Sequence, residues 1–305
     1  MNSLKGFLYG LATSVTFGLI PLFTLPLMKG GMALDSILFY RFLFATLALA
    51  GMMKLHKESF SIERKDIPVL LLLAGFYTAS ALFLFWGYDF MGAGVATTLH
   101  FTYPVFVTLL MLILFRERAS WVTWLAIVLA IYGVAKLSLK GGELVLDPLG
   151  MVIVLLSAVG YASYITTVNK SRVKTMNSRK LAFYVFVFTT ILFAVKAFLN
   201  EGIQPIPDAM SLTNLILLAV VPTVISNITL VLAVHHIGGT LTSILGAMEP
   251  VTAVCIGAFV FGEEFTWQEA FGIALILVAV TMIILGKPIQ NTLSTVVRMI
   301  RPRHA

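Results

Sequence analysis

Charged residues are scarce in this sequence of 305 residues. They make up 11% of the chain, whereas 59% of the residues are hydrophobic and the mean hydropathy is +0.97. Soluble domains carry about 25% charged residues, so the composition excludes a water-soluble domain and indicates an integral membrane protein. Cysteine is rarer still. Cys255 stands alone in an apolar run, which excludes a disulfide framework and a thiolate metal cluster, and we expect it to pack between helices.

Enzyme and cofactor motifs are also missing. The sequence has no Walker glycine loop, no His-Glu-x-x-His and no Gly-x-Ser-x-Gly, so we expect neither a primary pump nor an enzyme, and no cofactor. The pair His235-His236 lacks a carboxylate or cysteine at ligand spacing, so no metal site is expected. The net charge of +7 comes from basic residues in short segments between apolar runs, which argues against nucleic acid as a partner.

Long apolar runs are what the sequence has in abundance. A helix needs about 20 apolar residues to cross the roughly 30 Å hydrocarbon core of a lipid bilayer. The runs are continuous and lack the alternation of a membrane β-barrel, so an all-α membrane protein is predicted. The ten predicted transmembrane helices cover residues 4–27, 35–54, 67–88, 93–115, 121–138, 148–169, 180–199, 212–235, 239–262 and 267–286.

The basic residues predict the orientation, because Lys and Arg near helix ends are retained in the cytoplasm. With the N terminus inside, most of the 21 Lys and Arg residues fall on the inner side. The outer side holds only Lys29, Lys136, Lys140 and Lys196, and Arg41 lies within a span. This bias predicts a multi-pass protein of the cytoplasmic (inner) membrane with both termini in the cytoplasm and residues 288–305 as a basic cytoplasmic tail.

The sequence repeats itself at an offset of 146 residues. The segments aligned by this offset are 103–105 with 249–251 and 115–118 with 261–264, and at an offset of 144 residues 17–18 aligns with 161–162. Each half, 1–140 and 147–287, is predicted to hold five helices. An odd number of helices forces the second half to enter the membrane in the opposite sense, so the ten helices form two inverted five-helix repeats.

Inverted repeats are typical of carriers, because two similar halves can exchange inward-open and outward-open shapes. The substrate cavity is expected near the membrane midplane between the halves, where polar residues, Pro and Gly are tolerated. We therefore interpret the chain as a secondary transporter of small molecules that works by alternating access. A membrane-embedded transferase is a weaker alternative, since the sequence shows no acidic or histidine cluster at one membrane face.

The chain resembles the EamA family of the drug/metabolite transporter superfamily over about residues 4–286. The resemblance rests on the order of these elements: Phe17-Gly18, Arg41-Phe42, Tyr103-Pro104, Glu249-Pro250, the glutamates Glu117 and Glu263, and Gly272. It implies a ten-helix carrier of amino acids, nucleotide-like metabolites or other small solutes, often moved outward. The sequence departs from the family at Phe17, where tryptophan is usual, and at Arg116, where glycine is usual.

Glu249 is the leading candidate for substrate contact, because an ionisable group inside the membrane is costly to insert. It lies about ten residues into its helix beside Pro250, where it would bind an ammonium group, carry a coupling proton, or bond backbone carbonyls freed by the proline. His100 lies one turn before Pro104, as a cavity residue or as a satisfied interhelical histidine. Glu117 and Glu263 are assigned to capping or interfacial contacts.

Arg41 is expected to pair with an acid such as Asp35 or Asp89, and an anion-binding role is the alternative. Gating or structural roles are expected for Phe17, Gly18, Arg41, Pro104 and Pro250. Besides Glu249 and His100, the predicted substrate-binding residues are Tyr77, Ser80, Phe101, Tyr103, Tyr161 and Asn227.

A cavity with one carboxylate, one histidine, several tyrosines and an arginine suits a small zwitterion or organic cation better than a polyanion, which needs clustered Arg and Lys. Export of amino acids or related amine-bearing solutes is therefore predicted, the direction resting on the resemblance alone. The alternative is uptake of a choline-like cation held by aromatic faces and Glu249. Protons are a candidate coupling ion, and both a monomer and a homodimer fit the sequence.

Overall fold

The computed structural model describes residues 2–116, 120–140, 143–144, 146–200, 202–264 and 266–300. The first half contains α1 (Asn2–Gly18), α2 (Ile20–Lys29), α3 (Leu34–Leu55), the short η1 turn (Arg64–Asp66), α4 (Ile67–Gly87), α5 (Ala93–His100), α6 (Tyr103–Phe115) and α7 (Trp121–Ser138). A two-stranded antiparallel hairpin follows, formed by β1 (Leu139–Lys140) and β2 (Glu143–Leu144).

The second half contains α8 (Pro148–Lys170), the η2 turn (Arg172–Thr175), α9 (Ser178–Leu199), α10 (Ala209–Ala219), the π-helical segment η3 (Val220–Ile225), α11 (Ser226–Leu245), α12 (Met248–Phe261) and α13 (Trp267–Ile300). Eight helical segments in the described residues are long and apolar enough to cross a membrane, and two shorter apolar helices cover Trp121–Lys136 and Met248–Phe261. The helical membrane fold is confirmed, while the count of ten crossings stays a prediction.

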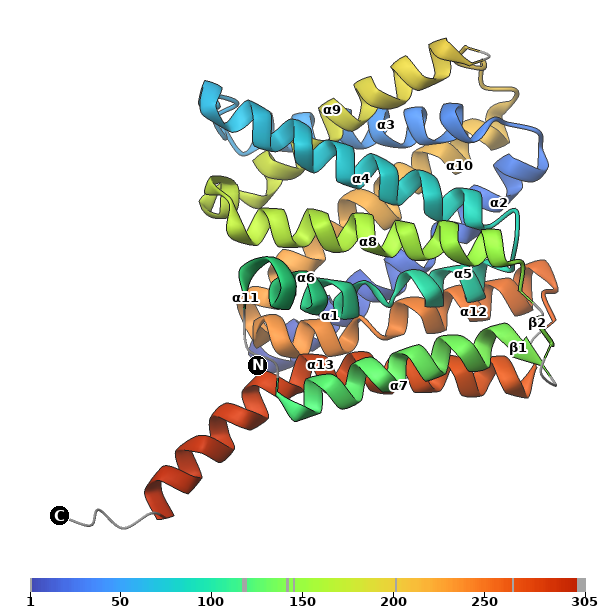
Figure 1. Cartoon of the computed structure of the whole chain (residues 1–305). Helices are drawn as coiled ribbons and strands as arrows, with labels where there is room; N and C mark the ends of the chain where they lie inside the picture. The colour runs from blue at the N-terminus through green and yellow to red at the C-terminus, as the bar shows by residue number, and fades with distance from the viewer. Residues whose placement is uncertain are drawn as a thin grey trace.

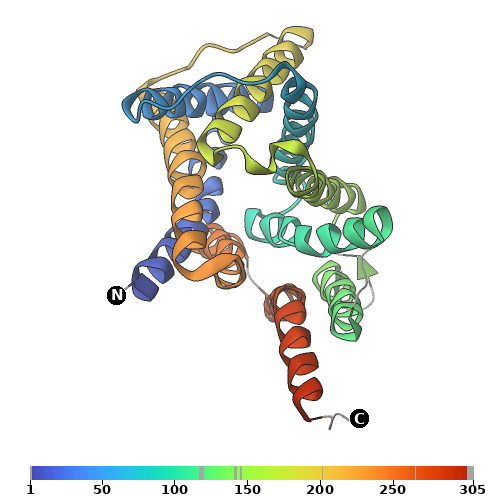
Figure 2. The same ribbon diagram turned by 90° about the vertical axis from the view of Figure 1, so that its left-hand side faces the viewer.

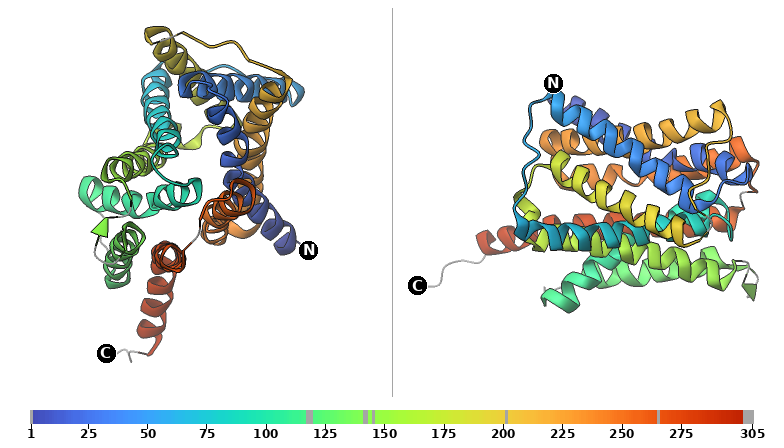
Figure 3. Two further views of the ribbon diagram at one scale, coloured as in Figure 1. Left: turned by 90° about the vertical axis from the view of Figure 1, so that its right-hand side faces the viewer. Right: turned by 90° about the horizontal axis from the view of Figure 1, so that it is seen from above.

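The two halves run in opposite directions. In Figure 1, α1 starts at the left of the bundle, whereas α8, the first helix of the second half, starts at the right beside β2. We call the end that carries β1 and β2 the hairpin end, and the end where α1 begins the N-terminal end. Views from these two ends show helices of both halves arranged around a central region (Figures 2 and 3), with α7 packed against α13 at the edge of the bundle.

Helix breaks occur at equivalent places in the two halves. The span 93–115 is divided between α5 and α6, and Pro104 occupies the first turn of α6. A proline loses no helical hydrogen bond at this position, because the N–H groups of the first turn have no acceptor within the helix. In the second half α11 continues to Leu245 and Pro250 occupies the first turn of α12. The break before α12 therefore lies inside the predicted span 239–262, as the break before Pro104 lies inside the span 93–115.

The ends of α6 and α12 are also equivalent, since both helices stop at a residue in the left-handed conformation. Gly262 has φ 67° and Arg116, its counterpart in the repeat, has φ 52°. Glycine adopts this conformation without steric cost, whereas an L residue does so at about 1–2 kcal/mol. Arg116 thus stands at a helix end whose left-handed conformation favours glycine.

The predicted basic tail, residues 288–305, includes the end of α13, which is helical to Ile300, and its cytoplasmic position stays a prediction. One further expectation differs from the structure. Cys255, expected to pack between helices, has an exposed side chain on α12, because it lies on the face of this helix that turns away from the bundle.

Candidate functional site

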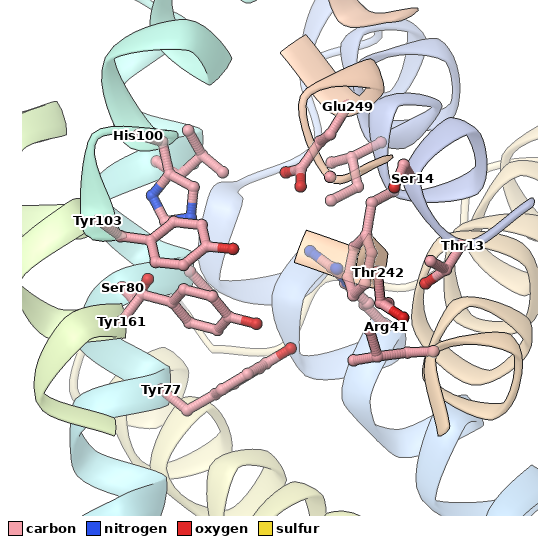
Figure 4. Close-up of a pocket in the computed structure, with 16 residues that line it drawn as sticks. Thr13, Ser14, Arg41, Tyr77, Ser80, His100, Tyr103, Tyr161, Thr242 and Glu249 are labelled. Atoms are coloured by element: carbon pink, nitrogen blue, oxygen red, sulfur yellow. The ribbon is translucent and has the colours of Figure 1, made fainter. Parts of the chain in front are cut away.

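A cavity of about 130 Å³ lies between the two halves, near the middle of the bundle. Its lining residues are Thr13, Ser14, Phe17, Ile20, Arg41, Tyr77, Ser80, Ala81, Leu84, His100, Tyr103, Tyr161, Leu230, Thr242, Gly246 and Glu249. A cavity of this size suits a small solute. Figure 4 shows the polar side chains of both walls directed into this space.

Residues related by the repeat meet at this cavity. Four pairs line it: Phe17 with Tyr161, Leu84 with Leu230, His100 with Gly246, and Tyr103 with Glu249. Because each pair combines equivalent positions of the two halves, the cavity lies where the halves face one another. This is the position at which the inverted repeat predicts a transported solute to bind.

Glu249 is the second residue of α12, directly after the helix break, and its carboxylate points into the cavity (Figure 4). Among the described residues, no hydrogen bond or ion pair to this carboxylate is present. Pro250 fixes the first turn of α12 and so the direction in which Glu249 leaves the backbone. The structure therefore places an available carboxyl group on the cavity wall.

Arg41 reaches the same wall from α3. Its Nε donates a hydrogen bond to Thr223 Oγ1 over 3.1 Å, and its guanidinium carbon lies 5.2 Å and 5.3 Å from the ring centres of Phe42 and Phe85. These two contacts are within cation–π range. Arg41 and Glu249 do not form an ion pair with each other, so the cavity is lined by a guanidinium and a carboxyl group that are not paired with one another.

The expected pairing of Arg41 with Asp35 or Asp89 is wrong. Lys196 Nζ contacts the two carboxylate oxygens of Asp35 at 2.6 Å and 2.7 Å, and Asn200 donates to the same carboxylate at 2.8 Å. Asp89 lies largely exposed at the hairpin end, and the partial burial of its carboxyl raises the pKa of that group. Asp35 is satisfied by a lysine from α9, which leaves Arg41 for the cavity.

His100 ends α5 and is both a packing residue and a cavity residue. Ser157 Oγ donates to the carbonyl of Ser80 over 2.6 Å, and the same oxygen lies 2.9 Å from His100 Nδ1. Since the serine proton is used toward the carbonyl, the network assigns the donor proton to Nδ1 and leaves Nε2 as an acceptor. The imidazole is thus fixed by α8 while it lines the cavity.

Tyrosine rings form the wall opposite Glu249 (Figure 4). The rings of Tyr103 and Tyr161 meet edge to face with centres 4.8 Å apart, and Tyr77 contacts Tyr161 at 6.2 Å and Tyr164 at 5.2 Å. Edge-to-face pairs of this kind fix ring orientation. The wall presents hydroxyl groups and aromatic surface to a solute.

Some predicted site residues lie elsewhere. Phe101 is buried beside Tyr103, and Asn227 lines a separate cavity of about 410 Å³, with its amide donating to the carbonyl of Thr223 at 2.6 Å. Gly18 lies against Thr252, where an added Cβ would meet Thr252 Cβ at 2.5 Å. Gly18 therefore permits close packing between the halves.

Polar lining residues that the sequence did not single out are Thr13, Ser14 and Thr242. Thr13 and Ser14 lie one helical turn before Phe17, and Thr242 lies two turns before Glu249, so a search along the helix faces of these residues would have found them.

Helices α5 and α12 lie between the cavity and the hairpin end. α5 runs from the hairpin end to His100, α12 runs from Glu249 back to the hairpin end, and the two helices pack together. Glu263 lies just past the end of α12. Its carboxylate accepts a hydrogen bond of 2.9 Å from the backbone N–H of Ala93, which is the first residue of α5. This contact has the capping character expected of Glu263, and Glu117 lies outside the described residues.

Comparisons with known proteins agree with this architecture. The sequence profile of the EamA-like transporter family matches residues 4–139 and 148–285. A solved crystal structure has a TM-score of 0.65 and 17% sequence identity over 92% of this chain and 95% of that chain, which shows the same fold.

Three related proteins carry only general names. The uncharacterized transporter sll1319 of Synechocystis is 28% identical over 200 residues, or 64% of this chain and 60% of that protein. The uncharacterized transporter YdfC of Bacillus subtilis is 25% identical over 217 residues, or 69% of each chain. The uncharacterized inner membrane transporter YedA of Escherichia coli is 23% identical over 196 residues, or 64% of this chain and 63% of that protein.

The chain spans less than two thirds of the length of sll1319 and of YedA. The names of the three relatives describe transporters and give no substrate. The family match covers both repeats and the cavity between them. The chain belongs to the EamA-like transporter family, and it is a multi-pass membrane protein.

Proposed function

We propose that this transporter moves amino acids or closely related amine-bearing zwitterions. The observation that carries the proposal is the presence of Arg41 and Glu249 in one small cavity without an ion pair between them. A carboxylate binds a guanidinium through paired hydrogen bonds, and an ammonium group binds a carboxylate. A solute that bears both groups satisfies both side chains at once.

The other lining residues fit the same class of solute. The acceptor Nε2 of His100 and the tyrosine hydroxyls supply hydrogen bonds to an ammonium group. A phosphorylated or multiply anionic solute meets only one guanidinium here, and it meets the carboxylate of Glu249 as a repulsive neighbour. The balance of charges favours a molecule with no net charge.

An organic cation such as a choline-like compound is the second candidate, in the direction of uptake. Its support is the aromatic wall of Tyr77, Tyr103 and Tyr161 facing Glu249, because ring faces attract quaternary ammonium groups. In this alternative Arg41 has no partner on the solute. The two candidates therefore differ in whether Arg41 contributes to binding.

Outward transport and coupling to protons are parts of the proposal with separate support. Export follows the behaviour of the family that the sequence resembles, since alternating access itself is reversible and gradients decide the direction. Glu249 and His100 are the cavity groups able to exchange a proton. Replacement of Glu249 or His100 by glutamine should lower transport and leave membrane insertion intact.

The test is a thermal-shift screen of the purified protein against amino acids, amines, nucleosides, sugars and phosphorylated compounds, followed by flux into liposomes. Each amino acid that stabilises the protein is tested again as its decarboxylated amine and its deaminated acid. Stabilisation should be strongest for the zwitterion. Stabilisation by phosphorylated or multiply anionic compounds alone would refute the proposal.

Variants separate the two candidates. Arg41→Gln should weaken binding of the zwitterion and leave binding of the amine unchanged, whereas Glu249→Gln should weaken binding of both. Glu264→Gln, a change to an exposed acid at the hairpin end, is the matched control and should alter neither. A choline-like hit that is unaffected by Arg41→Gln and lost in Glu249→Gln would support the organic cation instead.

A further inference from the structure

The π-helical segment η3 presents one hydroxyl to Arg41. Pro222 has no N–H to give to the carbonyl of Leu218, and Thr223 Oγ1 donates a hydrogen bond to that carbonyl over 3.0 Å. Short π-helical turns of this kind occur often at functional sites. Thr223 is fully buried, so its hydroxyl is available only to protein partners.

The direction of each hydrogen bond at Thr223 follows from its donors and acceptors. A hydroxyl has one proton, and here the proton goes to the Leu218 carbonyl. Toward Arg41 the oxygen is therefore the acceptor, and Arg41 Nε–H is the donor at 3.1 Å. An arginine has no acceptor of its own, so the contact requires an oxygen at this position.

Three contacts fix the guanidinium plane of Arg41. Thr223 holds its Nε edge, and the rings of Phe42 and Phe85 lie 5.2 Å and 5.3 Å from its central carbon. With Nε occupied, the terminal Nη groups remain for a partner in the cavity that Arg41 lines. A planar guanidinium binds a carboxylate through two parallel hydrogen bonds only when its plane is oriented correctly.

We propose that Thr223 is the positioning residue that orients Arg41 toward the carboxylate of the solute, and that it thereby determines selectivity for carboxylate-bearing solutes over simple amines. This inference rests on the proposed function of Arg41. Thr223 does not line the cavity itself, so its effect passes through the arginine.

Other bonds hold η3 without Arg41. Ser226 Oγ donates to the carbonyl of Pro222 at 2.6 Å, and Thr13 of α1 donates to the carbonyl of Ser226 at 2.7 Å. Asn227 donates to the carbonyl of Thr223. Removal of the Thr223 hydroxyl should therefore leave the segment folded and change mainly the orientation of the guanidinium.

The experiment compares Thr223→Val with Thr223→Ser in proteoliposomes, with an amino acid found in the screen and its decarboxylated amine as probes. Valine has nearly the shape of threonine without the hydroxyl, whereas serine keeps the hydroxyl. Thr223→Val should raise KM for the amino acid about tenfold, the effect of losing a hydrogen bond to a charged group. Its maximal rate and its KM for the amine should stay unchanged, and Thr223→Ser should restore KM for the amino acid.

Thr189→Val is the matched control. Thr189 is also fully buried, in α9, and its hydroxyl has no hydrogen-bond partner among the residues that the structure describes. The same substitution there removes a buried hydroxyl without affecting Arg41, so KM for both probes should stay at the wild-type value. If Thr223→Val gives little folded protein, Thr223→Ala removes the hydroxyl without adding a methyl group and replaces it.

Several results would overturn the inference. One is an equal loss for the amino acid and the amine in Thr223→Val, and another is a KM no different from that of Thr189→Val. In an Arg41→Gln background Thr223→Val should add nothing further, and an additive effect would contradict positioning through Arg41. If Arg41→Gln itself left KM for the amino acid unchanged, the proposed function would fail rather than the role of Thr223 alone.

Discussion

Replacement of Gly94 by alanine should destabilise the conformation in which α5 packs against α12. An ideal Cβ at Gly94 would lie 2.8 Å from Val254 Cα and 2.8 Å from Val254 Cγ2. One of these neighbours is a backbone atom, so the two helices must move apart. Overpacking of this kind costs about 1–3 kcal/mol, which corresponds to a shift of about 5- to 150-fold in a conformational equilibrium.

The assay is labelling of a cysteine introduced at Val95 in a protein whose native Cys255 has been replaced by serine. Val95 is buried and shares a cavity at the hairpin end with Val254. When α5 and α12 separate, a water-soluble thiol reagent reaches this position. Gly94→Ala should increase the labelling rate by roughly the same factor as the equilibrium shift, and it should lower Tm.

Gly51→Ala and Gly75→Ala are the controls, because in the described part of the chain an added Cβ at either position would meet no atom within 4 Å outside its own stretch of helix. Both changes should leave labelling unchanged and leave Tm unchanged or slightly higher, since alanine restricts the unfolded chain. If Gly94→Ala gave the labelling rate and Tm of Gly75→Ala, the close approach of α5 and α12 would not control access to the cavity from this end.

Of three further predictions, two concern the ends of helices and one concerns topology. Arg116→Gly should raise the free energy of unfolding by about 1 kcal/mol, measured by denaturation in detergent, because the left-handed conformation costs glycine nothing; no gain in stability would contradict the strain. Asp208 accepts a hydrogen bond from Ser211 N–H, which holds the pKa of its carboxyl below the ordinary value of 3.8. Its capping contribution is therefore present above that ordinary value and lost as pH falls through the lowered pKa. The difference in Tm between wild type and Asp208→Ala should disappear on acidification, while Asp208→Asn should keep the cap without this pH dependence. For topology, cysteines at positions 143 and 174 should label from opposite sides of the membrane, and labelling from one side would refute the ten-helix model.

Length and hydropathy predicted the spans well where one continuous helix crosses the bundle. The predicted spans 35–54 and 148–169 correspond to Leu34–Leu55 and Pro148–Lys170. The breaks inside spans were harder to predict, because a proline in a membrane helix is compatible with a kink, a break or a new first turn. Pro104 marked such a place in the sequence, and only packing decided that α5 ends and α6 begins there.

The role of Arg41 shows where sequence reasoning fails. Asp35 lies six residues earlier on the same helix and is the obvious partner. It instead pairs with Lys196, which is 161 residues away in the sequence. Thr223, the partner that Arg41 does have, is 182 residues away and belongs to the other half. Such pairings depend on which helices are neighbours, and hydropathy carries no information about neighbours. The prediction of Asn227 at the cavity failed for the same reason. Its amide donates a hydrogen bond to the backbone of η3.

The polarity of the cavity arises where the two repeats differ. Leu84 and Leu230 are identical and contribute a symmetric apolar surface, whereas Tyr103 is paired with Glu249. The position equivalent to Arg41 in the second half is valine at an offset of either 144 or 146 residues.

The anion of the cavity therefore belongs to one half and the cation to the other. A fully symmetric cavity would bind a solute equally well in two opposite orientations. For the zwitterion proposed above, an acid contributed by α12 and an arginine contributed by α3 would favour one orientation, with the ammonium group toward Glu249 and the carboxylate toward Arg41. Because the two groups lie on different halves, a solute that binds both links the halves that must move during transport, and its differential contact in each conformation can shift the equilibrium between them.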